Sequence, residues 1–131
     1  MKEETIFPMP YTVDNQYFRE QAVAARTNQD VLQANLNLES GRPIILYASK
    51  FMERKRPKDL VEAVARLAKD PKNRQPYLLM VGDGEQRAPL EQQVQDLGIE
   101  GSVRFTGFRN QSELPSFYSL CDLFVLPSLL E

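Results

Sequence analysis

The sequence contains no histidine, no tryptophan and only one cysteine, Cys121. Without histidine there is no imidazole to serve as the base of a Ser-His triad or to bind a metal, and one cysteine cannot build a zinc site. A single cysteine also excludes an internal disulfide framework, so we expect a reducing, cytoplasmic environment. Function must therefore rest on other side chains or on backbone groups.

Excess charge and long apolar runs are absent as well. The 16 basic and 18 acidic side chains give a net charge of -2, which offers no electrostatic case for binding nucleic acid. No apolar run approaches the length of a membrane span. With 131 residues, 42% hydrophobic and 26% charged, the composition is that of one ordinary globular domain.

Residues 1–43 differ in pattern from the rest and are expected to form a lead-in with helical segments. Asp14 can cap a helix that continues to Ala25, and a second polar helical stretch covers residues 29–36. A Gly-Arg-Pro turn signal ends this part. We therefore divide the chain into this lead-in and a domain formed by residues 44–131.

Strand and helix patterns alternate along the remainder of the chain. Continuous apolar runs, typical of strands buried on both faces, alternate with helical stripes and are separated by short connections. This order predicts a Rossmann-like α/β fold with an open parallel sheet and crossover helices. The expected strands cover residues 44–48, 77–81, 103–105 and 123–126. Three helices are expected between them: the first begins at Pro57, the second carries the apolar stripe Leu90, Val94 and Leu97, and the third follows an N-cap at Ser112.

One face of the last helix is expected to be core. Its apolar positions Leu114, Phe117, Tyr118 and Cys121 recur at helical spacing, so that Cys121 is a buried thiol and not a nucleophile. The strand that follows, residues 123–126, is expected to be an exposed apolar sheet edge that pairs with another chain.

Polar residues follow each expected strand, at the edge where open parallel sheets bind ligands. If the strand order is 3-2-1-4, the loops after the first and fourth strands flank one crevice, and Lys50 and Lys55 face Ser128 and Glu131 across it. A helix N-terminus near Pro57 adds free N–H groups, so the crevice suits an anion such as phosphate. The alternative is a solvated basic loop without a ligand.

Two glycine-bearing loops each admit two interpretations. Gly82 and Gly84 either permit a tight turn or let backbone N–H groups approach a phosphate. The stretch is not a full dinucleotide fingerprint, since Arg87 occupies the position of the third glycine, and Asp83 would repel a phosphate placed directly on this turn. Gly107 either ends a strand or exposes backbone groups that could read the edge of a base.

Five blocks of the sequence occur together in a known order and spacing. They are Val13-Asp14-Asn15 with Phe18, Ser49-Lys50 with Lys55, Val81-Gly82-Asp83-Gly84, Val103-Arg104-Phe105-Thr106-Gly107 and residues 121–131. In this order they resemble the C-terminal half-domain of retaining glycosyltransferases of group 1 (family 4), which have the GT-B fold. The resemblance implies that the chain is an incomplete C-terminal half of a GT-B enzyme, with residues 1–43 coming from the interdomain region.

By the same resemblance the chain would bind a nucleotide-diphosphate sugar as donor substrate. Lys50 and Lys55 correspond to the family's diphosphate-binding residues, although Ser49-Lys50 replaces the usual Gly-Arg and lysine lacks the planar fork of arginine. Glu131 corresponds to the first of two family glutamates and is the expected catalytic residue at the donor sugar. The residues expected at the donor nucleotide are Gly82, Gly84, Gly107, Phe108 and Ser128.

The chemistry implied by the resemblance is transfer of the sugar to an acceptor with retention at the anomeric carbon. Cations and a helix N-terminus can stabilise the departing diphosphate, and the sequence has no Asp-x-Asp pair, so we expect neither a metal nor a cofactor. Acceptor groups would come from a separate N-terminal domain. We therefore expect this chain alone to be inactive, and any contact of the enzyme with a membrane to be peripheral and through that domain.

Two other functions stay open at the level of the sequence. A Rossmann-like domain that binds NAD or S-adenosylmethionine would carry a third glycine and a ribose-binding acid at the end of the next strand, and both are missing. A non-catalytic interaction module would bind a partner and no nucleotide. Metal-independent binding of a nucleoside diphosphate distinguishes the glycosyltransferase from both.

Overall fold

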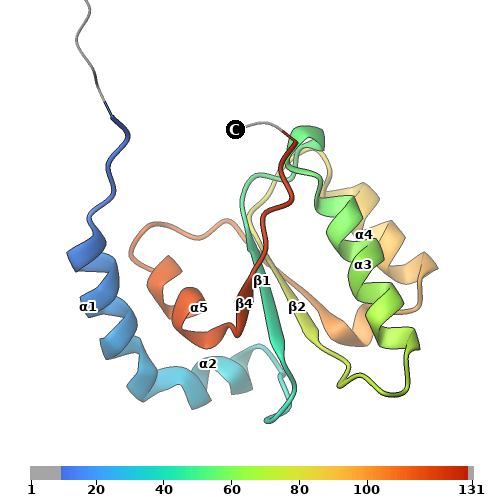
Figure 1. Ribbon diagram of the computed structural model, residues 1–131, viewed down its shortest axis with the longest axis horizontal. Coiled ribbons are helices and arrows are strands. Elements are labelled where there is room, and N and C mark those ends of the chain that lie inside the picture. Colours follow the sequence, from blue (N-terminus) through green and yellow to red (C-terminus); the bar gives the residue numbers. More distant parts are fainter. Residues whose placement is uncertain (1–9, 130–131) are drawn as a thin grey trace, which may run out of the picture.

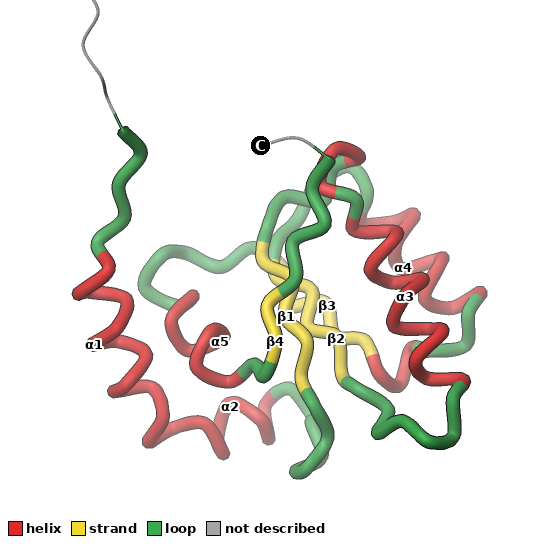
Figure 2. The backbone as a smooth tube through the Cα atoms, viewed as in Figure 1, coloured by secondary structure: helices red, strands yellow, loops and turns green. Residues whose placement is uncertain are grey.

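The computed structural model describes residues 10–129 and has the α/β architecture that the sequence predicts. One parallel sheet has the strand order β3-β2-β1-β4, and helices cover both of its faces, α3 and α4 on one side and α1, α2 and α5 on the other (Figure 1, Figure 2). Within the described residues, no helix combines the length and the apolar character needed to cross a bilayer. The strands are β1 (Ile44–Ala48), β2 (Tyr77–Val81), β3 (Val103–Gly107) and β4 (Leu123–Phe124), the helices are α1 (Asn15–Ala25), α2 (Gln29–Asn35), α3 (Pro57–Lys69), α4 (Arg87–Asp96) and α5 (Leu114–Leu120), and short 3-10 turns are η2 (Arg26–Asn28), η3 (Glu53–Lys55) and η4 (Glu100–Ser102).

The two central strands, β1 and β2, are buried because helices cover both of their faces. Side chains along a strand alternate between the faces. Ile45 and Tyr47 therefore join the core under α3 and α4, while Ile44 and Leu46 join the core under α5. Both strands lie where the continuous apolar runs predict them, residue for residue.

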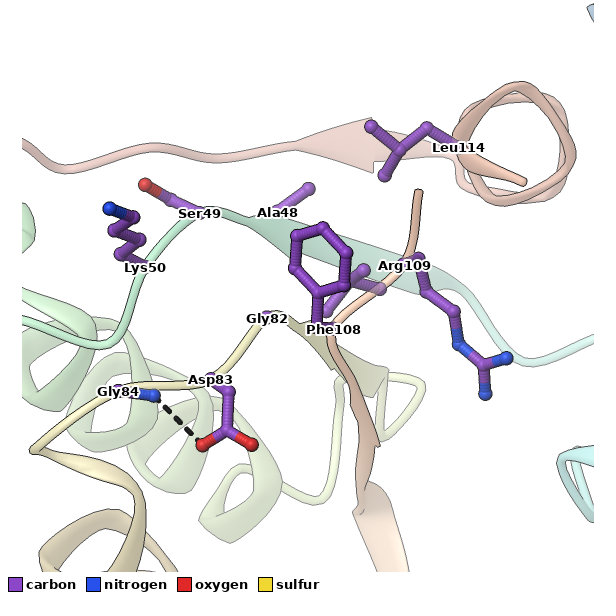
Figure 3. A pocket seen from close by; sticks show the side chains of 10 residues that line it. Ala48, Ser49, Lys50, Gly82, Asp83, Gly84, Phe108, Arg109 and Leu114 are labelled. Atoms are coloured by element: carbon purple, nitrogen blue, oxygen red, sulfur yellow. Dashed lines mark hydrogen bonds between the residues drawn. The ribbon is translucent and has the colours of Figure 1, made fainter. Parts of the chain in front are cut away.

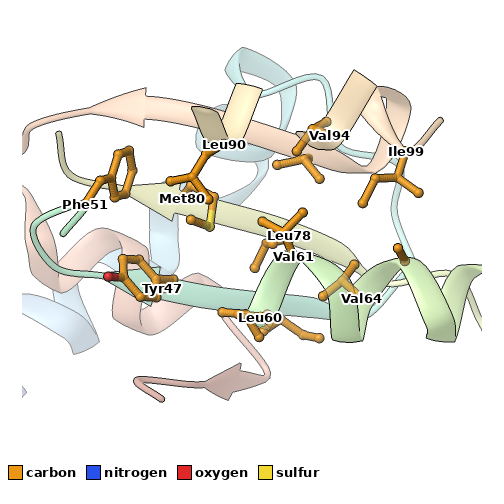
Figure 4. Packing of buried hydrophobic residues seen from close by; sticks show 13 residues of the cluster. Tyr47, Phe51, Leu60, Val61, Val64, Leu78, Met80, Leu90, Val94 and Ile99 are labelled. Carbon is orange, nitrogen blue, oxygen red and sulfur yellow. The ribbon is translucent and has the colours of Figure 1, made fainter. Parts of the chain in front are cut away.

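Helix α3 begins at Pro57, as predicted, because proline fits the first helical turn, where its missing N–H is not needed. Its buried face presses Leu60, Val61 and Val64 against the sheet (Figure 4). Complete burial of one such side chain stabilises the fold by about 1.5–3 kcal/mol. Phe51, fully buried in the same cluster, attaches the loop after β1 to this core.

Asp14 caps α1, as predicted. Its carboxylate accepts the backbone N–H of Tyr17 at 2.9 Å. Although none of its residues is buried, α1 packs along α5 (Figure 1). The lead-in thus forms part of the helical layer on that face of the sheet.

The end of the lead-in is held to the sheet by two arginines. The guanidinium of Arg104, on β3, donates to the carbonyl of Leu36 at 2.8 Å and to that of Asn37 at 3.0 Å. The ring of Tyr77 contacts both cations, since the guanidinium carbon of Arg42 lies 3.7 Å and that of Arg104 lies 5.3 Å from its centroid. These contacts fix the path of the chain into β1.

Helix α5 starts later than the sequence predicts. Ser112 was expected to cap it, but Glu113 occupies the cap position and the helix begins at Leu114. The side-chain oxygen of Asn110 accepts the N–H groups of Ser112 and Glu113, both at 3.1 Å. The Ser112 prediction was wrong because Asn110 builds a turn there, and Pro115 then suits the first helical turn.

The predicted apolar face of α5 is only partly core. Phe117 is buried, and Leu114 and Cys121 are half-buried against the same cluster. Burial raises the pKa of the Cys121 thiol, which disfavours the nucleophilic thiolate. Tyr118, by contrast, is 37% exposed, because its ring packs at the sheet edge against Phe124, with a centroid distance of 5.5 Å.

The fourth strand is shorter than the predicted range 123–126. The N–H of Val125 still donates to the carbonyl of Leu46 at 2.9 Å, but Pro127 has no N–H with which to continue the ladder. Leu123 is 54% and Phe124 is 42% exposed on the open edge of the described sheet. The predicted exposed apolar edge is confirmed for Leu123 and Phe124, whereas Val125 and Leu126 are partly buried against the core.

Candidate functional site

A cavity opens at the carboxyl ends of β1 and β2, where open parallel sheets bind ligands. Its volume of about 420 Å³ is within the range of small-molecule sites. The walls come from the ends of these two strands, the loop after β3 and the start of α5 (Figure 3). The lining residues are Ala48, Ser49, Lys50, Val81, Gly82, Asp83, Gly84, Phe108, Arg109 and Leu114.

Gly82 and Gly84 bring the loop after β2 into direct contact with the loop after β1. Their φ angles are +138° and +154°, a region that favours glycine. A Cβ on Gly82 would overlap the carbonyl oxygen of Ser49, and a Cβ on Gly84 would lie 2.6 Å from that of Phe51. Both glycines have the positive φ that the first interpretation requires, and the absence of a side chain lets the two loops approach closely.

The N–H groups of the same two glycines already have partners inside the protein. The N–H of Gly82 donates to the carbonyl of Gly107 at 2.9 Å, and the N–H of Gly84 donates to the carboxylate of Asp83 at 2.8 Å. The N–H of Phe51 in turn donates to the carbonyl of Asp83 at 2.9 Å. The three loops around the cavity are thus joined by hydrogen bonds, and a ligand would meet the glycines as a close-packed floor.

The loop after β3 presents an aromatic ring and unused backbone groups. Phe108 is 78% exposed and its ring extends on the side of the cavity, whereas the guanidinium of Arg109 extends the opposite way (Figure 3). No hydrogen bond from elsewhere in residues 10–129 reaches the backbone N–H or C=O of either residue. Such a wall suits a planar ligand ring that stacks on the ring of Phe108 and whose edge forms hydrogen bonds with the backbone groups of Phe108 and Arg109.

Arg109, which also lines the cavity, anchors this loop to α5. Its guanidinium lies 5.6 Å from the centroid of the Phe117 ring and donates to the carboxylate of Glu113 at 3.1 Å. Glu113 also accepts the backbone N–H of Asn110 at 3.0 Å. The Asn110 N–H first, and Arg109 second, lower the pKa of Glu113, because both stabilise its charged carboxylate.

Three charged side chains line the cavity, and two of them are paired with neighbours. Asp83 pairs with Arg87 at 3.1 Å, and Arg109 pairs with Glu113 at 3.1 Å. Lys50 forms no ion pair with any other residue of the described part of the chain. The ammonium group of Lys50 therefore leaves an unbalanced positive charge at the cavity, which favours an anionic ligand group.

The structure brings together much of the predicted nucleotide site. Lys50, Gly82, Gly84 and Phe108 line one cavity, and Gly107 directly precedes the aromatic residue at the end of β3. Their contact with a nucleotide remains a prediction.

Besides Gly107, two predicted site residues that the structure describes, Lys55 and Ser128, are not among those that line the cavity. Lys55 belongs to η3, and the hydroxyl of Ser128 is buried without a hydrogen-bond partner in residues 10–129. The segment after β4 does run beside the loop after β1, because the N–H of Leu129 donates to the carbonyl of Arg54 at 2.9 Å. Glu131 lies outside the described residues.

The N-terminus of α3 and Lys50 border different hollows. The chain passes through buried Phe51 and then η3 before the helix begins, which displaces the helix start from the end of β1. Arg56, at the cap, has a left-handed backbone, with φ 49° and ψ 44°, and pairs with Asp59. The hollow there has a volume of about 410 Å³ and is lined by Glu53, Arg56, Pro57, Lys58, Asp59 and Gln86.

Two arginines that pair with acidic groups beside the cavity, Arg87 and Arg109, have no predicted role in the sequence. Both form pairs at a spacing of four residues, with Asp83 and Glu113, and that spacing is readable in the sequence. Only the fold shows that these pairs lie beside a cavity. Among residues 10–129, no group of three or more acidic or cysteine side chains is placed to hold a metal ion.

Comparison with known sequences gives one family. The family described as "Glycosyl transferases group 1" matches residues 28–131. A similar curated protein is the lipopolysaccharide core biosynthesis glycosyltransferase LpsE of Rhizobium meliloti (strain 1021), with 38% identity over 96 residues, which are 73% of this chain and 26% of that protein. The chain thus spans about a quarter of the length of this relative.

Solved structures with the same fold are GT-B glycosyltransferases, which confirms the predicted fold class. HepE of Anabaena, in complex with UDP, superposes with a TM-score of 0.67 and 26% identity over 79% of this chain and 28% of its own. A glycosyltransferase from Rickettsia africae ESF-5 superposes with a TM-score of 0.78 over 98% of this chain and 33% of its own, and at 24% identity it shows the fold alone.

Proposed function

Since the chain belongs to the group 1 glycosyl transferases, we propose that it binds the donor of a sugar transfer, a nucleotide-diphosphate sugar. The observation that carries the proposal is the unbalanced charge of Lys50 beside an apolar wall that contains Phe108. A nucleoside diphosphate joins an aromatic base to an anionic tail, and the cavity offers a complement to each. HepE, which binds UDP and UDP-glucose, supports a donor of this class.

The base would occupy the wall formed by the loop after β3. It would stack on the ring of Phe108 and bond through its edge to the backbone groups of Phe108 and Arg109 that have no partner in residues 10–129. Gly107, at the end of β3, sets the direction in which this loop leaves the sheet, with a φ of +76°.

The diphosphate would lie toward Lys50, over the floor made by Gly82 and Gly84. Lys55, a second cation on the same loop, would approach the diphosphate from η3. The buried hydroxyl of Ser128 has no partner among residues 10–129, and a ligand oxygen would supply one.

The proposed reaction moves the sugar to an acceptor with retention and without a metal or cofactor. Lys50 and Lys55 would neutralise the departing diphosphate, which is the task a metal ion performs elsewhere. Glu131, outside the described residues, would act at the donor sugar. Because the chain spans about a quarter of LpsE, the acceptor groups are assigned to the rest of the enzyme, and the chain alone is predicted to be inactive. A cytoplasmic enzyme, with any membrane contact through its other domain, remains a prediction.

Isothermal titration calorimetry of the 131-residue chain tests the proposal. We expect UDP or GDP to bind in EDTA as well as in magnesium, and NAD and S-adenosylmethionine not to bind. Lys50→Ala should weaken nucleotide binding about three- to tenfold, since a partly exposed charge contact contributes about 1 kcal/mol. Lys72→Ala, which removes an exposed lysine from the loop after α3, is the matched control and should change nothing.

A folded chain that binds neither nucleotide in either buffer would contradict the proposal. Tight binding of a protein partner by that same chain would favour the non-catalytic interaction module, and binding of NAD or S-adenosylmethionine would favour the other Rossmann-like function.

A second proposal concerns self-association of the chain. The exposed edge of β4 presents Leu123 and Phe124, with the Tyr118 ring beside them. An unpaired apolar strand edge favours pairing with another strand, so we propose that two copies of this chain associate through β4.

A further inference from the structure

Asp83 places a carboxylate at the wall of a cavity for which an anionic ligand is proposed. Its hydrogen bonds explain what this acid does for the fold. Its backbone carbonyl accepts the N–H of Phe51 at 2.9 Å, and its carboxylate accepts the N–H of Gly84 at 2.8 Å. Asp83 thereby joins two loops of the cavity, but it also adds a negative charge that repels phosphate.

Arg87, the first residue of α4, offsets this charge. Its Nη1 lies 3.1 Å from Oδ2 of Asp83, and its Nε lies 3.0 Å from Oε1 of Glu91, so acids in the preceding and following turns hold its planar guanidinium. The Asp83 carboxylate is turned toward Gly84 and away from the ammonium of Lys50 (Figure 3). Asp83 therefore does not compete with a ligand for Lys50.

We propose that Arg87 is a positioning residue for the nucleotide, because its guanidinium, shared with Glu91, offsets part of the charge of Asp83 and holds that carboxylate away from Lys50. The inference rests on the proposed function, since it takes the ligand to be a nucleoside diphosphate. Arg87 does not line the cavity, so it acts through Asp83 and not by touching the ligand. Arg87 should therefore affect the binding of UDP, which carries phosphate charge, and not the binding of uridine, which carries none.

Calorimetry of the 131-residue chain with UDP and with uridine separates this electrostatic role from a structural one. Arg87→Gln should weaken UDP binding about two- to fivefold, the effect of one exposed ion pair, and leave uridine binding unchanged. Arg66→Gln is the matched control, because it breaks an ion pair of the same spacing, with Glu62 at 3.5 Å, on α3. The control should bind both ligands as the wild type does.

Two further variants cover the case in which Arg87→Gln folds poorly, which thermal unfolding will reveal. Asp83→Asn keeps an oxygen for the N–H of Gly84 but removes the charge, so it should tighten UDP binding about twofold and leave uridine binding unchanged. The double variant Asp83→Asn/Arg87→Gln should return UDP affinity to within about twofold of the wild type, because the two charges cancel.

Equal weakening of UDP and uridine binding by Arg87→Gln would overturn the inference and leave Arg87 a structural role alone. Unchanged UDP affinity in both Arg87→Gln and Asp83→Asn would also overturn it, while the proposed function would stand. Absence of UDP binding by the wild type would overturn the proposed function and this inference with it.

Discussion

At position 82 the requirements of the fold and of the site coincide in one residue. The backbone has a φ of +138°, and any side chain would be driven into the carbonyl oxygen of Ser49. The same residue donates its N–H to Gly107 and forms part of the cavity floor. A single methyl group at this position would therefore push apart the loops that define the cavity.

Gly82→Ala should lower the free energy of unfolding by roughly 3 kcal/mol or more, because backbone strain and overlap with a fixed carbonyl add together. Gly101→Ala is its control, since nothing lies within 4 Å of the added Cβ, and its stability should change by less than about 1 kcal/mol. Chemical denaturation measures both. Equal stability of the two variants would show that the contact with Ser49 relaxes easily.

Among the elements, those set by one apolar pattern along the chain were predictable, and those that depend on interactions between particular side chains or elements were not. The strands at residues 44–48 and 77–81 are continuous apolar runs, a pattern that few other structures explain. Ser112 failed as a cap because Asn110, two residues earlier, accepts the N–H groups of Ser112 and Glu113 and builds a turn there. Tyr118 was misplaced because helical spacing identifies a face but not which end of that face meets a sheet edge.

The candidate site follows the same division. The rule that ligands bind at the carboxyl ends of parallel strands identified Lys50 and Gly82 as cavity residues from sequence. It did not locate Lys55, because buried Phe51 and the η3 turn carry the chain away from the end of β1. The pairing of Arg87 with Asp83 needed the fold to show its place beside the cavity.

At the scale of elements, Arg104 is expected to attach the lead-in to the sheet. Arg104→Ala removes the hydrogen bonds to the carbonyls of Leu36 and Asn37 and the contact with the Tyr77 ring, and should lower the free energy of unfolding by about 2–3 kcal/mol. Urea denaturation of this variant beside Arg66→Ala, a surface control expected to change stability by less than about 0.5 kcal/mol, measures the difference. A loss of stability as small as that of the control would mean that the packing of α1 on α5, and not Arg104, attaches the lead-in.

In the whole molecule, the sheet has a cavity at the carboxyl ends of its strands and an open lateral edge at β4. The carboxyl ends of the strands converge on the cavity, while β4 exposes Leu123 and Phe124. The molecule therefore has two surfaces of different chemistry, one suited to a charged small ligand and one suited to another strand.

Phe124→Lys should abolish self-association of the chain, because a charge on an edge strand opposes pairing. Val23→Lys is the control, since Val23 is also exposed, at 57%, but lies on α1. Light scattering as a function of concentration should show a rising mass for the wild type and for the control, and a constant monomer mass for Phe124→Lys. A wild type that stays monomeric at high concentration would contradict association through β4.

We propose that the cavity between the loops after β1, β2 and β3 binds a nucleoside diphosphate. Titration of the isotope-labelled chain with UDP, followed by nuclear magnetic resonance of its backbone amides, locates the bound nucleotide. The largest chemical-shift changes should fall on residues 48–50, 82–84 and 107–110. Changes concentrated at residues 56–59, at the start of α3, or no change at any UDP concentration, would contradict this proposal.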